Sequence, residues 1–97
     1  MQYLIIDAAQ DATFAHVKEY AGAMVGCWIR NQTTKNAFLI AKGWIADLGW
    51  VVRSLKEQYP VSEETYRHKS EGWQYFEQAL IDDEVFVFFT SPKHDQA

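Results

Sequence analysis

Residues 84–90 (EVFVFFT) constrain the fold of this chain more than any other segment, because apolar side chains fill both alternating sets of positions. Successive side chains of a strand point to opposite faces, so Val85, Val87 and Phe89 face one way, and Phe86 and Phe88 face the other. A strand with one face in water alternates apolar and polar residues. We therefore predict a strand that is covered on both of its faces.

Two further strands follow from similar patterns. Residues 3–7 (YLIID) are apolar on both alternating sets until Asp7. Residues 50–59 (WVVRSLKEQY) begin with β-rich residues and become polar toward Pro60, where a proline interrupts strand pairing. The polar end of this segment indicates that it reaches an exposed rim of the sheet.

A helix is predicted over residues 33–48. Thr33 or Thr34 can cap its start, and Gly49 follows its end in the C′ position, which favours a left-handed glycine. Apolar residues recur at helical spacing along one stripe. The stripe consists of Ala37, Ala41, Trp44 and Leu48, with Phe38 and Ile45 beside it.

A second helical segment is predicted over residues 62–82. Ser62 is a suitable N-cap, and Val61 before it is placed to pack on Tyr66. The apolar pattern lapses before Gly72 and resumes with Trp73, Phe76 and Leu80. The segment is therefore either one helix with a weak middle or two short helices.

Residues 11–31 fit two incompatible patterns. A helix can begin with Asp11 as N-cap and stop at Gly22. Alternatively, strands over 15–21 and 24–30 can meet in a tight turn, because a glycine in the first central position suits a type II′ hairpin. We favour the hairpin, and the helix remains the alternative.

These elements predict an α+β fold: a two-layer, helix-on-sheet domain with a mixed sheet of four to five strands and two main helices. The order is β-β-β-α-β-α-β, or β-α-β-α-β-α-β if the contested segment is helical. A chain of 97 residues accommodates one hydrophobic core. We expect a single domain over residues 1–91 and a flexible C-terminal tail over 92–97.

Charge and cysteine content limit the partners and the location. The chain has 9 Lys and Arg against 13 Asp and Glu, a net charge of −4, which makes nucleic acid a poor partner. The first residues lack the basic start and long apolar run of a signal peptide, and no apolar run is long enough to cross a membrane. The single cysteine suits a reducing compartment. We expect a cytoplasmic protein that binds neither membrane nor nucleic acid.

Four tryptophans are the most unusual residues of the chain, and they fit two roles. Each lies on an apolar helix stripe or at a strand position, so core packing is the favoured role. Alternatively, the same rings line a pocket for a cation, a sugar or a flat ligand. The ligand-pocket candidates are Trp28, Trp44, Trp50 and Trp73.

Candidates for chemistry are weaker. The hairpin register would place Val17 opposite Trp28 and Lys18 opposite Cys27, and a lysine there would favour the thiolate. No base is positioned by a third group, so a structural thiol is the favoured interpretation. We predict no catalytic residues, metal ligands or cofactor. The histidines lack a zinc-binding spacing: they are His16, His68 and His94. The acidic run Asp82-Asp83-Glu84 fits a hydrated turn.

Three functional classes remain. We favour a non-enzymatic interaction protein, such as an accessory, inhibitor or immunity-type factor, because aromatic residues are enriched at protein interfaces. The alternatives are a small-molecule-binding protein with an aromatic pocket, and a small enzyme that uses Cys27 or a carboxylate.

We also expect a homodimer. If both helices pack on one face of the sheet, an apolar patch on the other face needs a cover, and twofold pairing is the commonest way to supply it. The predicted interface residues are Tyr3, Phe86 and Phe88.

Overall fold

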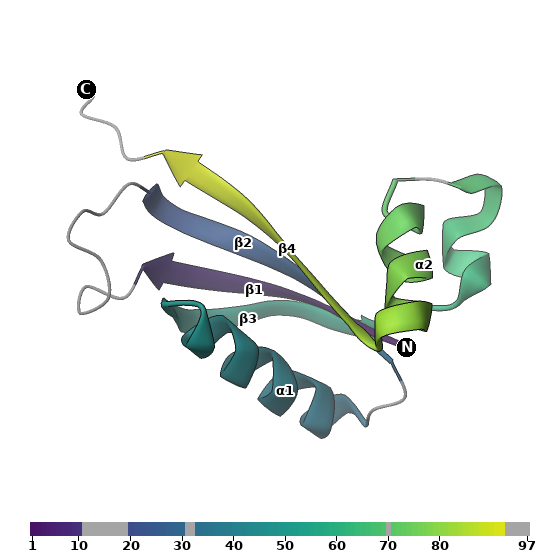
Figure 1. Cartoon of the computed structure of the whole chain (residues 1–97), viewed down its shortest axis with the longest axis horizontal. Coiled ribbons are helices and arrows are strands. Elements are labelled where there is room, and N and C mark those ends of the chain that lie inside the picture. The colour runs from purple at the N-terminus through teal and green to yellow at the C-terminus, as the bar shows by residue number, and fades with distance from the viewer. Residues whose placement is uncertain (11–19, 31–32, 70, 93–97) are drawn as a thin grey trace.

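A computed structural model describes residues 1–10, 20–30, 33–69 and 71–92 of the chain (Figure 1). Its strands are β1 (Gln2–Gln10), β2 (Tyr20–Ile29), β3 (Trp50–Pro60) and β4 (Glu84–Pro92), and its helices are α1 (Thr34–Asp47), the 3-10 helix η1 (Glu63–Lys69) and α2 (Trp73–Asp82). The predicted α+β class is confirmed. The expected tail lies outside the described residues, except that β4 extends to Pro92.

The four strands form one sheet in the order β3-β1-β2-β4. Every neighbouring pair is antiparallel, so the expected mixed sheet is wrong. The reason is the strand order, which separates the strands that run in the same direction: β1 lies between β3 and β2, and β2 lies between β1 and β4. Tyr3 on β1 lies between Trp28 on β2 and Tyr59 on β3.

Strand β2 corrects the predicted hairpin, because it runs without a turn through Gly22 and Ala23. On one side Trp28 pairs with Tyr3, and on the other it pairs with Val85, so Val17 is not its cross-strand partner. Residues 15–19, the rest of the predicted first arm, lie outside the described part of the chain.

A side chain from two strands away fills the space beside Gly22. A Cβ atom at this position would lie 2.9 Å from Nη2 of Arg53 and 3.2 Å from the backbone oxygen of Ala8. The same Nη2 donates a hydrogen bond to Oδ1 of Asp7 at 2.8 Å. The glycine therefore gives room to an arginine that reaches across β1, and a turn is not its role.

The two faces of the sheet carry separate hydrophobic clusters. On one face, apolar residues of β1 and β2 pack against α1; this cluster contains Leu4, Ile6, Ala8, Ala23, Val25, Cys27, Ile29, Ala37, Ala41 and Ile45. The opposite face packs against η1 and α2 through a second cluster, which contains Trp28, Val61, Tyr66, Phe76 and Ala79. The helices therefore cover opposite faces, and the expectation that both lie on one face is wrong.

This arrangement explains why β1 and β4 are apolar on both faces. Phe86 and Phe88 pack against the α1 cluster, whereas Val85 and Val87 pack against the α2 cluster. Figure 1 shows α1 running along one side of the sheet, while α2 and η1 sit at the end where β4 begins. The predicted burial of both faces of β4 is thus achieved in part within one chain, by α1 on one face and by α2 on the other.

Helix α1 begins and ends as predicted. The hydroxyl of Thr33 accepts a hydrogen bond from the backbone N–H of Asn36 at 3.2 Å. Its buried residues are Ala37, Ala41 and Ile45, while Trp44 and Leu48 lie at the margin of the stripe and are half exposed. Small alanines let the helix approach the sheet closely.

Gly49 has a φ of 90°, the left-handed conformation predicted for it. Replacing Gly49 with valine is expected to lower the free energy of unfolding by about 1 kcal/mol or more, because a β-branched residue is strained at positive φ. Urea unfolding of Gly49→Val beside Gly43→Val provides the measurement. A Cβ at Gly43 meets no other atom within 4 Å, so only the ordinary helix-propensity change is expected there. Equal stability of Gly49→Val and the wild type would contradict this assignment.

The second helical segment consists of two short helices, one of the two predicted alternatives. Gly72 separates them with a φ of 97° and serves as the N-cap of α2. Val61 and Tyr66 belong to one buried cluster, in agreement with the predicted packing of the two residues. None of the helices in the described part of the chain is both long and apolar enough to span a membrane.

Candidate functional site: an aromatic pocket

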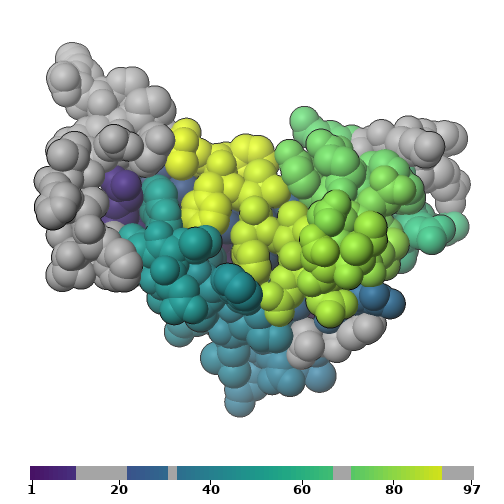
Figure 2. Space-filling view, viewed as in Figure 1, coloured from purple at the N-terminus to yellow at the C-terminus, as the bar shows by residue number. Residues whose placement is uncertain are grey.

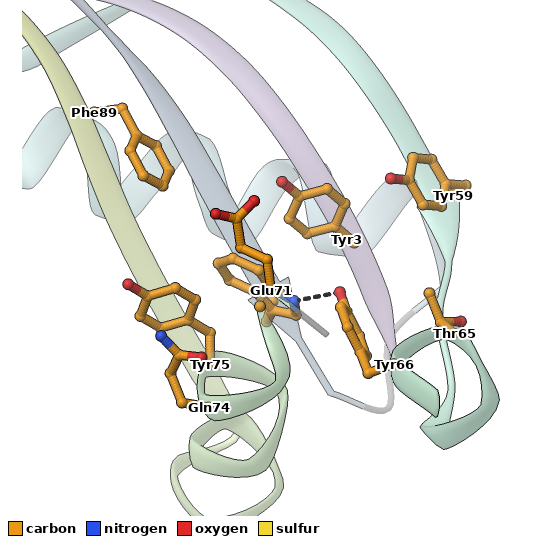
Figure 3. Close-up of a pocket in the computed structure, with 10 residues that line it drawn as sticks. Tyr3, Tyr59, Thr65, Tyr66, Glu71, Gln74, Tyr75 and Phe89 are labelled. Carbon is orange, nitrogen blue, oxygen red and sulfur yellow. Dashed lines mark hydrogen bonds between the residues drawn. The ribbon is translucent and has the colours of Figure 1, made fainter. Parts of the chain in front are cut away.

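A pocket of about 340 Å³ lies where η1 and the start of α2 meet the sheet. Its walls are mainly aromatic, and its lining residues are Tyr3, Trp28, Tyr59, Thr65, Tyr66, Glu71, Gly72, Gln74, Tyr75 and Phe89. Figure 3 shows Tyr3 and Tyr59 on one side of the pocket, and Phe89 and Tyr75 on the opposite side. This volume lies in the range of small-molecule sites, which is about 300 to 1,000 Å³.

Trp28 is the most buried ring of the pocket, with only 3% of its surface exposed. It extends along β2 over Gly26, where an added Cβ would lie 3.2 Å from Cζ3 of the indole. The indole N–H donates a hydrogen bond to the hydroxyl of Tyr66 at 2.8 Å. The Tyr3 and Tyr75 rings contact it from the sheet and from α2, at centroid distances of 4.7 and 5.0 Å.

Gly72 allows the helical segment to close over these rings. A Cβ at this position would lie 3.0 Å from Cε1 of Tyr66 and 3.7 Å from Cζ2 of Trp28. Its positive φ also suits a residue without a side chain. The glycine therefore sets both the turn between η1 and α2 and the close approach of two pocket rings.

The hydroxyls of Tyr3 and Tyr66 stay neutral at physiological pH. Burial raises the pKa of Tyr3 to about 12, and the neighbouring Tyr59 and Tyr66 act in the same direction. Burial also raises the pKa of Tyr66, although its hydrogen bond with Trp28 opposes the change. These groups supply hydrogen bonds rather than negative charge.

Glu71 gives the pocket its charge, because it is the one Asp or Glu among the lining residues, and these include no Lys, Arg or His. Its side chain is exposed. In Figure 3 the carboxylate extends into the space between the Phe89 and Tyr3 rings. Aromatic faces carry negative quadrupole density, so a carboxylate among them adds to the same sign of potential. The lining therefore combines one formal negative charge with aromatic surface and carries no formal positive charge.

Of the four predicted pocket tryptophans, only Trp28 lines this pocket. Trp44 and Trp50 lie on the side of the sheet that α1 covers. There the Trp44 ring contacts Phe86 at a centroid distance of 6.0 Å, and the Trp50 ring contacts Phe88 at 5.5 Å. Trp73 lies on α2 and stacks on Phe76 at 5.8 Å.

The predicted interface residues do not form one surface. Tyr3 lies in the aromatic pocket, and Phe86 and Phe88 lie on the opposite face of the sheet beneath Trp44 and Trp50. The grouping failed because the register aligns Tyr3 with Trp28 and Val85, which puts Tyr3 on the face opposite Phe86 and Phe88. Tyr59, Tyr66, Tyr75 and Glu71 were missed, since they come from three elements and one connecting turn and share no spacing along the sequence.

Other candidate groups show no arrangement for chemistry. Cys27 is fully buried in the α1 cluster, where burial raises the pKa of its thiol to about 12, so the thiolate is disfavoured. Its strand neighbours are Leu4 and Phe86, so the predicted pairing with Lys18 is wrong. His16 and His94 lie outside the described residues, within which no three His, Cys, Asp or Glu side chains could hold a metal ion.

The acidic run Asp82-Asp83-Glu84 forms the predicted turn between α2 and β4. Asp83 adopts a left-handed conformation with a φ of 73°, and the side chains of Asp82 and Asp83 are exposed. Exposed carboxylates in a turn agree with the hydrated run predicted from the sequence. The aromatic pocket is therefore the candidate site that these observations leave. Comparison with protein-family models, with curated proteins and with solved structures finds no match to this chain.

Proposed function

We propose that this protein is a non-catalytic binding protein that holds a small organic cation in its aromatic pocket. The observation that carries the proposal is Glu71 in a mainly aromatic site whose lining includes no basic residue. Quaternary ammonium groups are recognised in this way, because their charge is spread over methyl groups that pack against aromatic faces. The net charge of −4 adds a weak long-range attraction for cations.

Several features support a binding role over an enzymatic one. The pocket offers hydroxyls and one amide for orientation, but its lining includes no thiol, serine or histidine. Cys27, the only thiol, is buried in the cluster beneath α1, on the other face of the sheet. We place the protein in the cytoplasm, where a free buried thiol remains reduced.

A second role, in self-association, is supported by the exposed edge of β4 and is developed below. This role corresponds to the interaction protein expected from the sequence. Self-association does not depend on the pocket. The two roles are separable, because most pocket residues lie away from β4.

The proposal predicts that choline binds and that its uncharged isostere dimethylbutanol, in which carbon replaces nitrogen, does not. Glu71→Gln is expected to weaken choline binding about fivefold to tenfold, which corresponds to about 1 kcal/mol. Glu77→Gln is the matched control, since Glu77 is an exposed acid of α2 that does not line the pocket. Isothermal titration calorimetry gives the affinities, and the indole N–H signal of Trp28 in an NMR titration locates the site.

Equal binding of choline and its isostere would show that charge is not recognised and would overturn the proposal. Absence of choline and tetramethylammonium binding at millimolar concentration would overturn it as well. Equal losses in Glu71→Gln and Glu77→Gln would assign the effect to overall charge rather than to the pocket, and would also count against it.

A further inference from the structure

The two edges of the sheet differ in how they are protected. The pairing of edge strand β3 with β1 has two register irregularities. Strand β3 also contains three charged residues, Arg53, Lys56 and Glu57. Bulges and charges are the usual means by which natural sheets prevent another strand from pairing with an edge. Strand β4 has neither along its middle, because its only charged residue is Glu84 at the start.

The free side of β4 is long and regular. Its residues pair with β2 without interruption from Glu84 opposite Ile29 to Thr90 opposite Ala23. No other described strand pairs with its outer side. Figure 2 shows β4 (yellow) at the molecular surface, between α1 (teal) and α2 (green). Its outward-facing backbone donors and acceptors are therefore available to an extended chain.

Apolar side chains flank this edge on both faces of the sheet. On the α1 face, Trp44 is 47% exposed where its ring contacts Phe86. On the other face, Phe89 is 56% exposed, beside its strand partner Met24. A strand added to this edge would meet apolar surface above and below its backbone.

We propose that two copies of this chain associate through antiparallel pairing of their β4 edges, which joins the two sheets into one of eight strands. A second copy fits this edge because β4 itself is an extended, nearly uncharged strand that is apolar on both faces. Twofold symmetry makes the pairing antiparallel, which places each Glu84 near the far end of the partner strand and keeps the two like charges apart. It also brings the half-exposed Trp44 of each copy toward the partner.

This interface differs from the dimer expected from the sequence. In the dimer expected from the sequence, Phe86 and Phe88 form the contact surface. In the structure, the two rings pack against Trp44 and Trp50 within one copy. The pairing depends on the backbone of β4, so a charge placed on this strand opposes it, as charges do on natural edges.

The test compares charge substitutions on the two edges. Val87→Lys places an ammonium at the middle of β4, where Val87 is half-buried against the α2 cluster, and Thr90→Lys places one at an already exposed position. Val51→Lys is the matched control, because Val51 is a 47% exposed valine on edge strand β3. Sedimentation equilibrium across micromolar concentrations gives the mass, and circular dichroism confirms folding.

We expect twice the 11.2 kDa mass of one chain for the wild type and for Val51→Lys. Folded Val87→Lys and Thr90→Lys are expected to weaken association at least tenfold. If Val87→Lys fails to fold, Thr90→Lys decides. A monomeric wild type at all concentrations would overturn the proposal, and so would a dimer that Val51→Lys disrupts while Thr90→Lys leaves it intact.

Discussion

Replacing Trp28 with alanine is expected to lower the free energy of unfolding by about 3 to 5 kcal/mol, the usual loss for a large aromatic residue removed from a core. The indole contacts rings from three directions, and its removal leaves a cavity between the sheet and α2. It also leaves the largely buried hydroxyl of Tyr66 without its described donor.

Urea unfolding measures this effect, and Trp44→Ala is the matched control. Trp44 is half exposed, so we expect its removal to cost well under half as much as that of Trp28. The midpoints should differ while the slopes with denaturant stay equal. Equal losses for Trp28→Ala and Trp44→Ala would contradict the distinction between a core ring and a surface ring.

The contrast between these tryptophans shows the limit of helical periodicity. Spacing alone places Trp44 on the apolar stripe of α1, because it follows Ala37 and Ala41 at helical intervals. The centre of that stripe depends on which side of the helix touches the sheet. The structure centres it on Ala37, Ala41 and Ile45, which moves Trp44 to the margin beside Phe86.

Local patterns predicted most elements, because strands and helices depend on side-chain alternation and capping. Residues 84–90, the Thr33 cap and the left-handed Gly49 all occur as predicted. The order of strands could not be predicted, since it depends on contacts between distant segments. Gly22 illustrates the difficulty, because a glycine that accommodates a remote arginine is indistinguishable in sequence from one that makes a turn.

The aromatic pocket was harder to predict from the sequence than the strand order. Its rings come from β1, β2, β3, η1, α2 and β4, and they meet only because η1 and α2 fold back over one end of the sheet. Trp28 was identified from its strand position, and Tyr3 was singled out for a different role. Glu71 carries no pattern of its own, since a single acid before a glycine is common in loops.

The protein is expected to lose stability as the pH rises from about 9 to about 12. Burial raises the pKa of Cys27 to about 12, whereas the thiol in the unfolded chain titrates near 8.5. Burial also raises the pKa of Tyr3 to about 12 from its ordinary value of about 10. Between the unfolded and folded pKa values the unfolded chain binds fewer protons, so each unit of pH favours unfolding.

The full difference between folded and unfolded Cys27 is on the order of 4 kcal/mol, with a slope of about 1.4 kcal/mol for each pH unit. Urea unfolding at several pH values between about 8 and 11 measures that slope. Cys27→Ala removes the thiol, so its stability should fall less steeply with pH, even though the smaller side chain lowers stability at neutral pH. Tyr3→Phe keeps the ring and should remove a separate part of the slope above about pH 10. If Cys27→Ala retained the full wild-type slope, burial of Cys27 would not be the cause, and the thiol would have to be accessible to solvent in the folded protein.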